Sequence, residues 1–191
     1  MSDKSIVVAV YDTHEKAEKV VGELQHAGFD MTKLSIVGKN PHAEEHVVGF
    51  YNAGDRVRHW GKRGAFWGGI WGLLFGSAFF AIPGLGPILV AGPLVGWIVA
   101  GLEGAALVGG LSAVGAGLFS LGIPKDSVLE YEIALKTDQF LLLMDGTAAE
   151  ASRAHEIIVA TNPVALHVHT GVTDKEYDES EYQRELALAK G

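Results

Sequence analysis

The stretch Val7-Val-Ala-Val-Tyr-Asp-Thr-His-Glu-Lys-Ala-Glu18 is the most informative part of the chain, because its pattern returns near the other end. The second copy is Leu141-Leu-Leu-Met-Asp-Gly-Thr-Ala-Ala-Glu-Ala151. Each copy runs from an apolar strand through an Asp/Thr turn into a helix that contains Ala and Glu, and a short strand follows. Two such βαβ units predict an α+β fold, a ferredoxin-like sandwich.

In the first unit, the pattern predicts strands over residues 5–11 and 33–37, with a helix over residues 16–26 between them. A further strand is expected over residues 47–51. The second half predicts helices over residues 126–136 and 148–160 and strands over residues 140–144 and 164–169. Both halves must lie on the same side of any membrane if they are to fold together.

Between the two units lies an apolar block, residues 64–124, whose single formal charge is Glu103. Sixteen of the chain's 25 glycines lie in it. Two breaks, at residues 83–87 and 103–104, divide it into three apolar stretches. The first reaches the length of a membrane span, the second is short and the third is at the lower limit. We therefore expect a helical hairpin with its tip at residues 83–87.

Small residues recur at every fourth position of the block, which is typical of apolar helices whose backbones approach closely. The predicted helix-packing residues are Gly64, Gly68, Gly72, Gly76, Gly92, Gly96, Ala100, Gly104, Gly109, Ala113 and Gly117. The spacing does not distinguish packing within one chain from packing between copies. An acid in apolar surroundings is costly without a partner, so Glu103 is either a functional polar group or a helix-break residue at a membrane surface.

Basic and aromatic residues flank the block, as expected for the cytoplasmic interface of a membrane protein. The predicted interface residues are Arg56, Arg58, Trp60, Lys62, Arg63 and Lys125. The predicted organisation is half of a ferredoxin-like domain (1–60), a glycine-zipper insert (61–123), the second half of the domain (124–171) and an acidic tail (172–191).

Composition excludes several classes of chemistry. The chain has no cysteine, so it has no disulfide, thiolate metal site or thiol nucleophile. Its net charge of −8 argues against nucleic acid as a partner. Two histidine pairs, His42 with His46 and His167 with His169, fall short of the three or four converging ligands that zinc needs. No nucleotide-binding or nucleophile motif is present. We expect no catalytic residue, no metal and no cofactor.

Residues 7–30, which continue the opening stretch through Lys19-Val-Val-Gly-Glu-Leu-Gln-His-Ala-Gly-Phe-Asp30, and Leu34-Ser-Ile-Val-Gly38 carry a resemblance. They are similar to the N-terminal module of the bacterial general stress protein family, the heat-induced YflT-like domain. The full layout, with its Gly-rich insert, resembles bacterial membrane or general stress proteins. The resemblance implies a bacterial, stress-linked, non-enzymatic protein and supplies no catalytic residues.

Three functions remain open at this point. The first is a stress-associated protein of the bacterial inner membrane, with both polar halves cytoplasmic, that self-associates through a glycine-zipper hairpin. The second is a structural homo-oligomer that buries its apolar hairpins in a cytoplasmic, soluble or lipid-containing particle. The third is a small channel or transporter with Glu103 as its polar group. Membrane lipid and further copies of the chain are the expected partners, and any small-molecule ligand is unknown.

Overall fold

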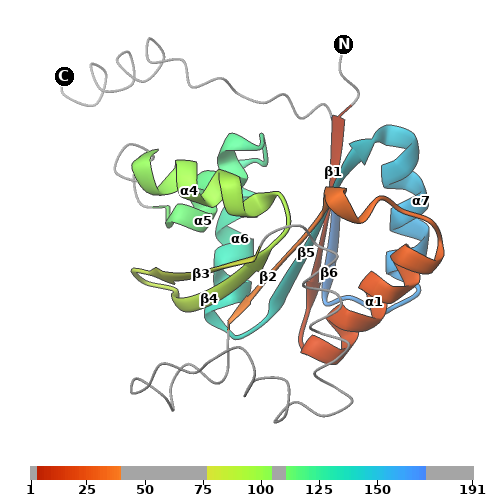
Figure 1. Ribbon diagram of the computed structural model, residues 1–191, viewed down its shortest axis with the longest axis horizontal. Coiled ribbons are helices and arrows are strands. Elements are labelled where there is room, and N and C mark those ends of the chain that lie inside the picture. Colours follow the sequence, from red (N-terminus) through yellow and green to blue (C-terminus); the bar gives the residue numbers. More distant parts are fainter. Residues whose placement is uncertain (1–3, 40–76, 105–110, 171–191) are drawn as a thin grey trace.

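The computed structural model describes residues 4–39, 77–104 and 111–170, which form five α-helices and one open antiparallel sheet of six strands (Figure 1). The predicted α+β class is confirmed. The strands are β1 (Lys4–Tyr11), β2 (Leu34–Lys39), β3 (Ser77–Ile82), β4 (Gly86–Ala91), β5 (Phe140–Thr147) and β6 (Ala165–Thr170). They lie in the order β3-β4-β2-β5-β1-β6, and every neighbouring pair is antiparallel.

Two βαβ units interleave in this sheet. The first is β1, α1 (His14–His26) and β2, and the second is β5, α7 (Ala148–Val159) and β6. Strands β1 and β2 both pair with β5, whereas β5 and β6 both pair with β1. Each unit therefore places a strand between the two strands of the other, so the two ends of the chain share one sheet.

Both helices of these units begin at a threonine cap. The side chain of Thr13 accepts a hydrogen bond from the Lys16 backbone N–H, and the side chain of Thr147 accepts one from Glu150. Glu150 returns a bond to the Thr147 backbone and completes a capping box. The apolar face of α1 is buried, at Ala17, Val20, Val21 and Leu24.

The helical hairpin predicted for the apolar block is wrong for residues 77–91, which form the β-hairpin β3–β4. The turn itself falls where it was predicted. Leu85 N–H donates to the Ile82 carbonyl at 3.1 Å, and Gly84 has a φ of 83°, as the third residue of a type II turn requires. Strand β4 pairs with β2, so the hairpin extends the sheet shared by the two βαβ units.

The rest of the described apolar block is helical: α4 (Leu94–Gly104) and α5 (Ala113–Ser120), followed by α6 (Lys125–Lys136). Among the residues that the structure describes, no helix has both the length and the apolar character to cross a membrane. The predicted strand at 47–51 and the acidic tail lie outside the described residues.

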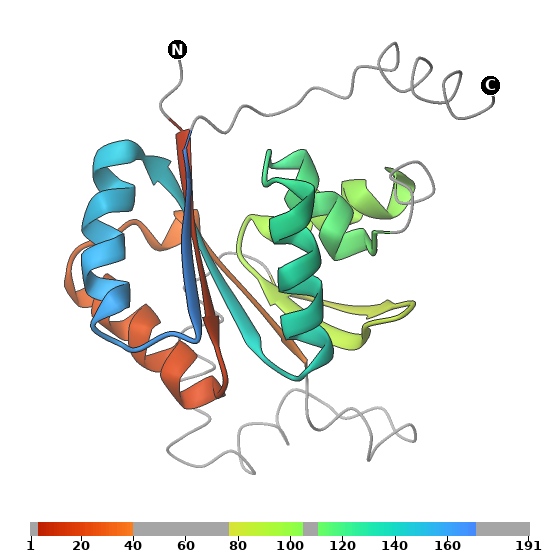
Figure 2. The same cartoon turned by 180° about the vertical axis from the view of Figure 1, so that it is seen from behind.

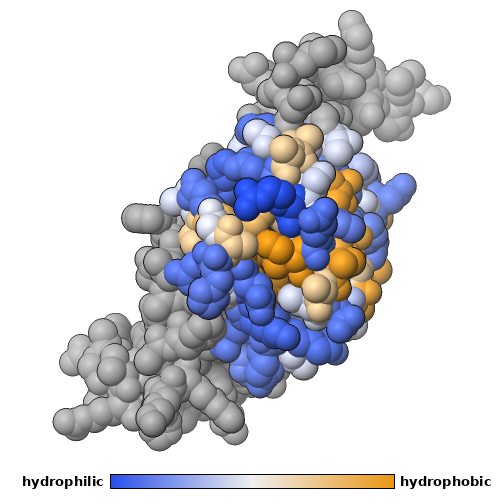
Figure 3. Space-filling view, turned by 90° about the vertical axis from the view of Figure 1, so that its right-hand side faces the viewer, coloured by the Kyte–Doolittle hydropathy of each residue, from blue (hydrophilic) through white to orange (hydrophobic). Residues whose placement is uncertain are grey.

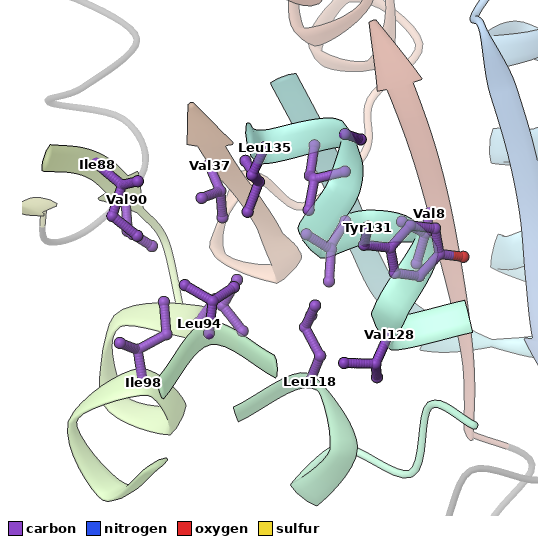
Figure 4. Close-up of a cluster of buried hydrophobic side chains, with 14 of the residues drawn as sticks. Val8, Val37, Ile88, Val90, Leu94, Ile98, Leu118, Val128, Tyr131 and Leu135 are labelled. Carbon is purple, nitrogen blue, oxygen red and sulfur yellow. The ribbon is translucent and has the colours of Figure 1, made fainter. Parts of the chain in front are cut away.

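Helices cover both faces of the sheet. Helices α4, α5 and α6 lie on one side and α1 and α7 on the other (Figures 1 and 2). Alternate strand residues point to opposite sides, so Val8 and Val10 belong to the core under α4, α5 and α6, and Val7 and Ala9 to the core under α1 and α7. The first core includes Leu94, Ile98, Leu118, Val128 and Leu135 from the three helices (Figure 4). On the other side, the surface over α1 and α7 is largely hydrophilic around a smaller apolar area (Figure 3).

Candidate functional site

The apolar block contributes a layer in which α4 and α5 pack almost backbone to backbone. A Cβ atom added at Gly101 would lie 2.7 Å from the Ala113 carbonyl oxygen and 3.0 Å from the Gly117 nitrogen. One added at Gly117 would lie 3.1 Å from the backbone of Trp97. A side chain at Gly101 would therefore push the two helices apart, and one at Gly117 would require the α4 backbone to give by a few tenths of an ångström.

The connection from β4 into α4 also depends on glycine. Gly92 has a φ of 93°, and a Cβ there would run into the Leu34 carbonyl and lie 2.8 Å from the Ser35 Cα. The buried Ser35 hydroxyl accepts a hydrogen bond from the Leu94 N–H at 3.1 Å. The first turn of α4 is thereby fixed to strand β2.

The outer face of α4 is apolar and uncovered by any other described residue. Val99 is 48% and Leu102 49% exposed. Gly96, one turn before Val99, and Ala100, which follows it, are exposed as well. A Cβ added at Gly96 would meet nothing within 4 Å. This α4 outer face, defined as Gly96, Val99, Ala100 and Leu102, differs from ordinary amphipathic helices, whose outer faces are polar.

A buried carboxylate lies at the N-terminus of α5. Glu132, on α6, is only 5% exposed and accepts a hydrogen bond from the Ser112 N–H at 2.7 Å. The Ser112 hydroxyl accepts from the Gly115 N–H at 3.2 Å and caps the helix. A negative charge near the first turn is favoured by the unpaired N–H groups and the dipole of α5. Glu132 is therefore explained as a structural group that joins α5 to α6.

A second polar cluster lies between α6 and β6. The Tyr131 hydroxyl is 3.2 Å from His167 Nδ1 and 2.9 Å from His169 Nε2. Burial raises the pKa of Tyr131, and the charge of Glu130 raises it further. Burial lowers the pKa of His169, and the neighbouring His167 adds to this effect. The phenol can donate to one imidazole and accept from the other, with the histidine tautomers set accordingly.

The structure separates the residues predicted to pack helices. Ala113 and Gly117 lie at the α4–α5 contact, Gly92 lies in the turn before α4, and Gly96 and Ala100 face outward. Glu103 and Gly104 are the last two residues of α4. Lys125, predicted for a membrane interface, is the exposed first residue of α6. The other predicted residues lie outside the described residues, namely Gly64, Gly68, Gly72, Gly76, Gly109, Arg56, Arg58, Trp60, Lys62, Arg63, His42 and His46.

The sequence interpretation missed three residues that organise this region. Gly101 lies outside the fourfold spacing, Glu132 is one of many acids in the second half, and Tyr131 has no motif around it. His167 and His169 form a pair in the sequence, but their partner Tyr131 reaches them only through the packing of α6 over β6. In the described ranges, no three His, Asp or Glu side chains converge as a metal-binding group.

Comparison with known proteins bears on the first half of the chain. Residues 6–80 match the sequence family described as the heat induced stress protein YflT domain. No curated protein and no solved structure matches the chain. The matched residues include almost all of β1, the whole of α1 and β2, and the first four residues of β3. The resemblance seen in residues 7–38 is confirmed: over residues 6–80, this chain carries a heat-induced stress protein YflT domain.

Proposed function

We propose that the protein is a non-enzymatic, stress-associated bacterial protein that assembles with further copies of itself through the α4 outer face. The observation that carries this proposal is that α4 presents exposed small residues beside exposed apolar ones. Gly96 and Ala100 are four residues apart, and Val99 and Leu102 lie beside them along one side of the row. Such a row lets a second helix approach closely while the apolar side chains beside it leave water.

The α4–α5 contact supports this reading, because it shows how the same helix packs when a partner is present. At Gly101, the backbone of α5 lies so close that a Cβ would not fit. The outer row offers a comparable surface, with open space at Gly96. Helix α4 is thus a two-sided packing element with one side occupied within the chain.

Charge argues against an anionic lipid surface as the partner of this face. The chain has a net charge of −8, and Glu103 is the single charged residue of α4. Anionic membranes attract clusters of Lys and Arg, which α4 lacks. A ferredoxin-like sandwich made of the two interleaved βαβ units is the framework that would present α4 in each copy.

Membrane attachment is the second candidate, with both polar halves in the cytoplasm. It is favoured by the basic residues at 56–63, which precede an apolar segment at residues 64–76. In that case lipid rather than protein would be the main partner of the block. The channel hypothesis has no helical hairpin with a tip at residues 83–87 to build on, because residues 77–91 belong to the sheet.

The two candidates are separated by sizing the full chain without detergent and by flotation with lipid vesicles. Self-association predicts a multimer in the soluble fraction and loss of that multimer in the double variant Val99→Asp/Leu102→Asp. The matched control is Leu129→Asp/Ile133→Asp on α6, whose side chains are 42% and 61% exposed. A wild-type monomer that floats with vesicles would overturn self-association and support membrane attachment.

A further inference from the structure

We infer that Tyr131, His167 and His169 form a binding site for a borderline divalent transition-metal ion, the class to which Zn²⁺ and Cu²⁺ belong. This site is separate from the α4 outer face and does not depend on the proposed function. It requires the phenol oxygen as a ligand alongside the two imidazoles.

The backbone places the two imidazoles on the same side of β6. His167 pairs with Val8 and His169 with Ile6 in the β1–β6 register, and both strand partners belong to the core under α6. Alternation sends the intervening Val168 to the opposite face. His-X-His on a strand therefore presents two nitrogen ligands side by side toward one covering helix.

Helix α6 supplies the third group. Tyr131 is fully buried, and its ring lies over the sheet near Val8 (Figure 4). Its ring centroid is 6.0 Å from that of His167 and 6.2 Å from that of His169. Both histidines are partly exposed on the edge strand of the sheet, so an ion can reach them from solvent.

The distances are close to those between ligands of one ion. Tyr131 Oη lies 3.2 Å from His167 Nδ1 and 2.9 Å from His169 Nε2. Two ligands of a tetrahedral ion with bonds of about 2.0 Å are separated by about 3.3 Å. The two imidazole centroids are 6.3 Å apart, so binding would draw the histidine rings toward each other.

Ligand chemistry sets the class of ion. Imidazole nitrogen suits Zn²⁺, Cu²⁺ and Ni²⁺, whereas Ca²⁺ and Mg²⁺ require sets of oxygen ligands. The histidines would bind as neutral imidazoles, and the phenol would release its proton to solvent as its oxygen joins the ion. Glu130, next to Tyr131 on α6, places a negative charge near the phenol that attracts a cation. The same charge, together with burial, raises the pKa of the phenol, so the bound ion itself has to displace the phenol proton.

The test is calorimetric titration of the metal-free full chain with ZnCl₂. The expected result is one ion per chain at a site that His167→Gln/His169→Gln weakens by more than about tenfold, since even outer partners of metal ligands typically contribute 10–100-fold. The matched control is His26→Gln/His155→Gln, which changes two histidines on α1 and α7 and leaves the Zn²⁺ affinity unchanged.

A second variant keeps the test decisive if the histidine double variant does not fold. Tyr131→Phe removes only the ligand oxygen and retains the buried ring. With Cu²⁺ as the probe, the wild type is expected to show a phenolate-to-copper charge-transfer band that Tyr131→Phe lacks. Equal Zn²⁺ affinity in wild type and folded His167→Gln/His169→Gln, or the absence of that band from the wild type, would overturn the site.

Discussion

The helices on the two faces of the sheet are held by different means. On one face, α1 and α7 have amphipathic sequences, threonine caps and polar outer surfaces. On the other face, α4 and α5 have almost no charge and pack through glycine and alanine at backbone distance. A Gly-rich apolar segment whose sequence resembles a membrane hairpin can therefore serve as one layer of a folded α+β unit.

The largest effect on the free energy of unfolding is expected in the two cores, one on each side of the sheet. Leu24→Ala on α1 and Leu118→Ala on α5 each remove a fully buried side chain. We expect each to lower the free energy of unfolding by about 2–5 kcal/mol, from lost burial and the cavity left behind. Urea denaturation of the full chain measures both. If Leu24→Ala destabilised the protein and Leu118→Ala had no effect, α5 would not be part of the same folded unit.

A smaller effect is expected at the α4–α5 contact. Gly101→Ala places a methyl group against the Ala113 carbonyl, where a Cβ would be 2.7 Å away. Moving two packed backbones apart is expected to cost about 1–3 kcal/mol of stability. Thermal unfolding monitored by circular dichroism measures the loss. An unchanged midpoint would show that the two helices are not in close contact.

The same contrast explains why the sequence predicts the helices on one face of the sheet better than those on the other. The sequences of α1 and α7 contain local signals for helix. Each begins at a threonine cap, Thr13 or Thr147, and α1 has an apolar row at Ala17, Val20, Val21 and Leu24. Those helices and strands β1, β2, β5 and β6 fall within a few residues of their predicted positions. Local patterns were sufficient there, because each element is polar on one side or bounded by clear turn residues.

The apolar block could not be predicted in the same way. Where both sides of an element are apolar, strands and helices lose their distinguishing periodicity. The regular spacing of small residues favoured helix for residues 65–82, although Pro83-Gly84 is a strong signal for a type II turn within a β-hairpin. The decisive interaction is the pairing of β4 with β2 across about fifty residues, which no local pattern encodes.

The Tyr131 cluster shows the same limit on a smaller scale. His167 and His169 are visible as an alternating pair in the sequence, but Tyr131 lies 36 and 38 residues before them. Only the packing of α6 over β6 brings the phenol to both imidazoles. A candidate ligand set of this kind depends on tertiary structure and has no sequence spacing of its own.

The next prediction concerns α7 and the dependence of the chain's stability on pH. The pKa of Glu150 is lowered to about 2, first by the hydrogen bond from Lys33 and then by the bonds from Thr147. A lowered pKa means that this contribution to stability is complete above the carboxyl's ordinary pKa of 4.5 and is lost as pH falls toward 2. Because solvent screens this partly exposed pair, we expect a loss of about 1 kcal/mol.

The measurement is a set of urea denaturations between pH 6 and pH 2.5 for wild type and Glu150→Gln. The variant should lose stability less steeply in the acid range, since it lacks the carboxylate that must be protonated. Glu156→Gln on the exposed side of α7 is the matched control and should follow the wild-type slope. Identical slopes for wild type and Glu150→Gln would show that the Glu150 carboxylate, with its bonds from Lys33 and Thr147, does not set the acid sensitivity.

The smallest effect is expected at Gly96, where the stability of the single chain and its self-association should change in opposite directions. Gly96 is exposed in α4, and an added Cβ meets nothing within 4 Å of it in the single chain. Gly96→Ala should therefore raise the free energy of unfolding by about 0.5–1 kcal/mol, through higher helix propensity. If a second copy packs on the α4 outer face, the same methyl group should weaken self-association measured by light scattering, because it separates the two helices. A variant that is more stable and associates as well as wild type would place the interface elsewhere, whereas a less stable one would show that Gly96 is already covered within the chain.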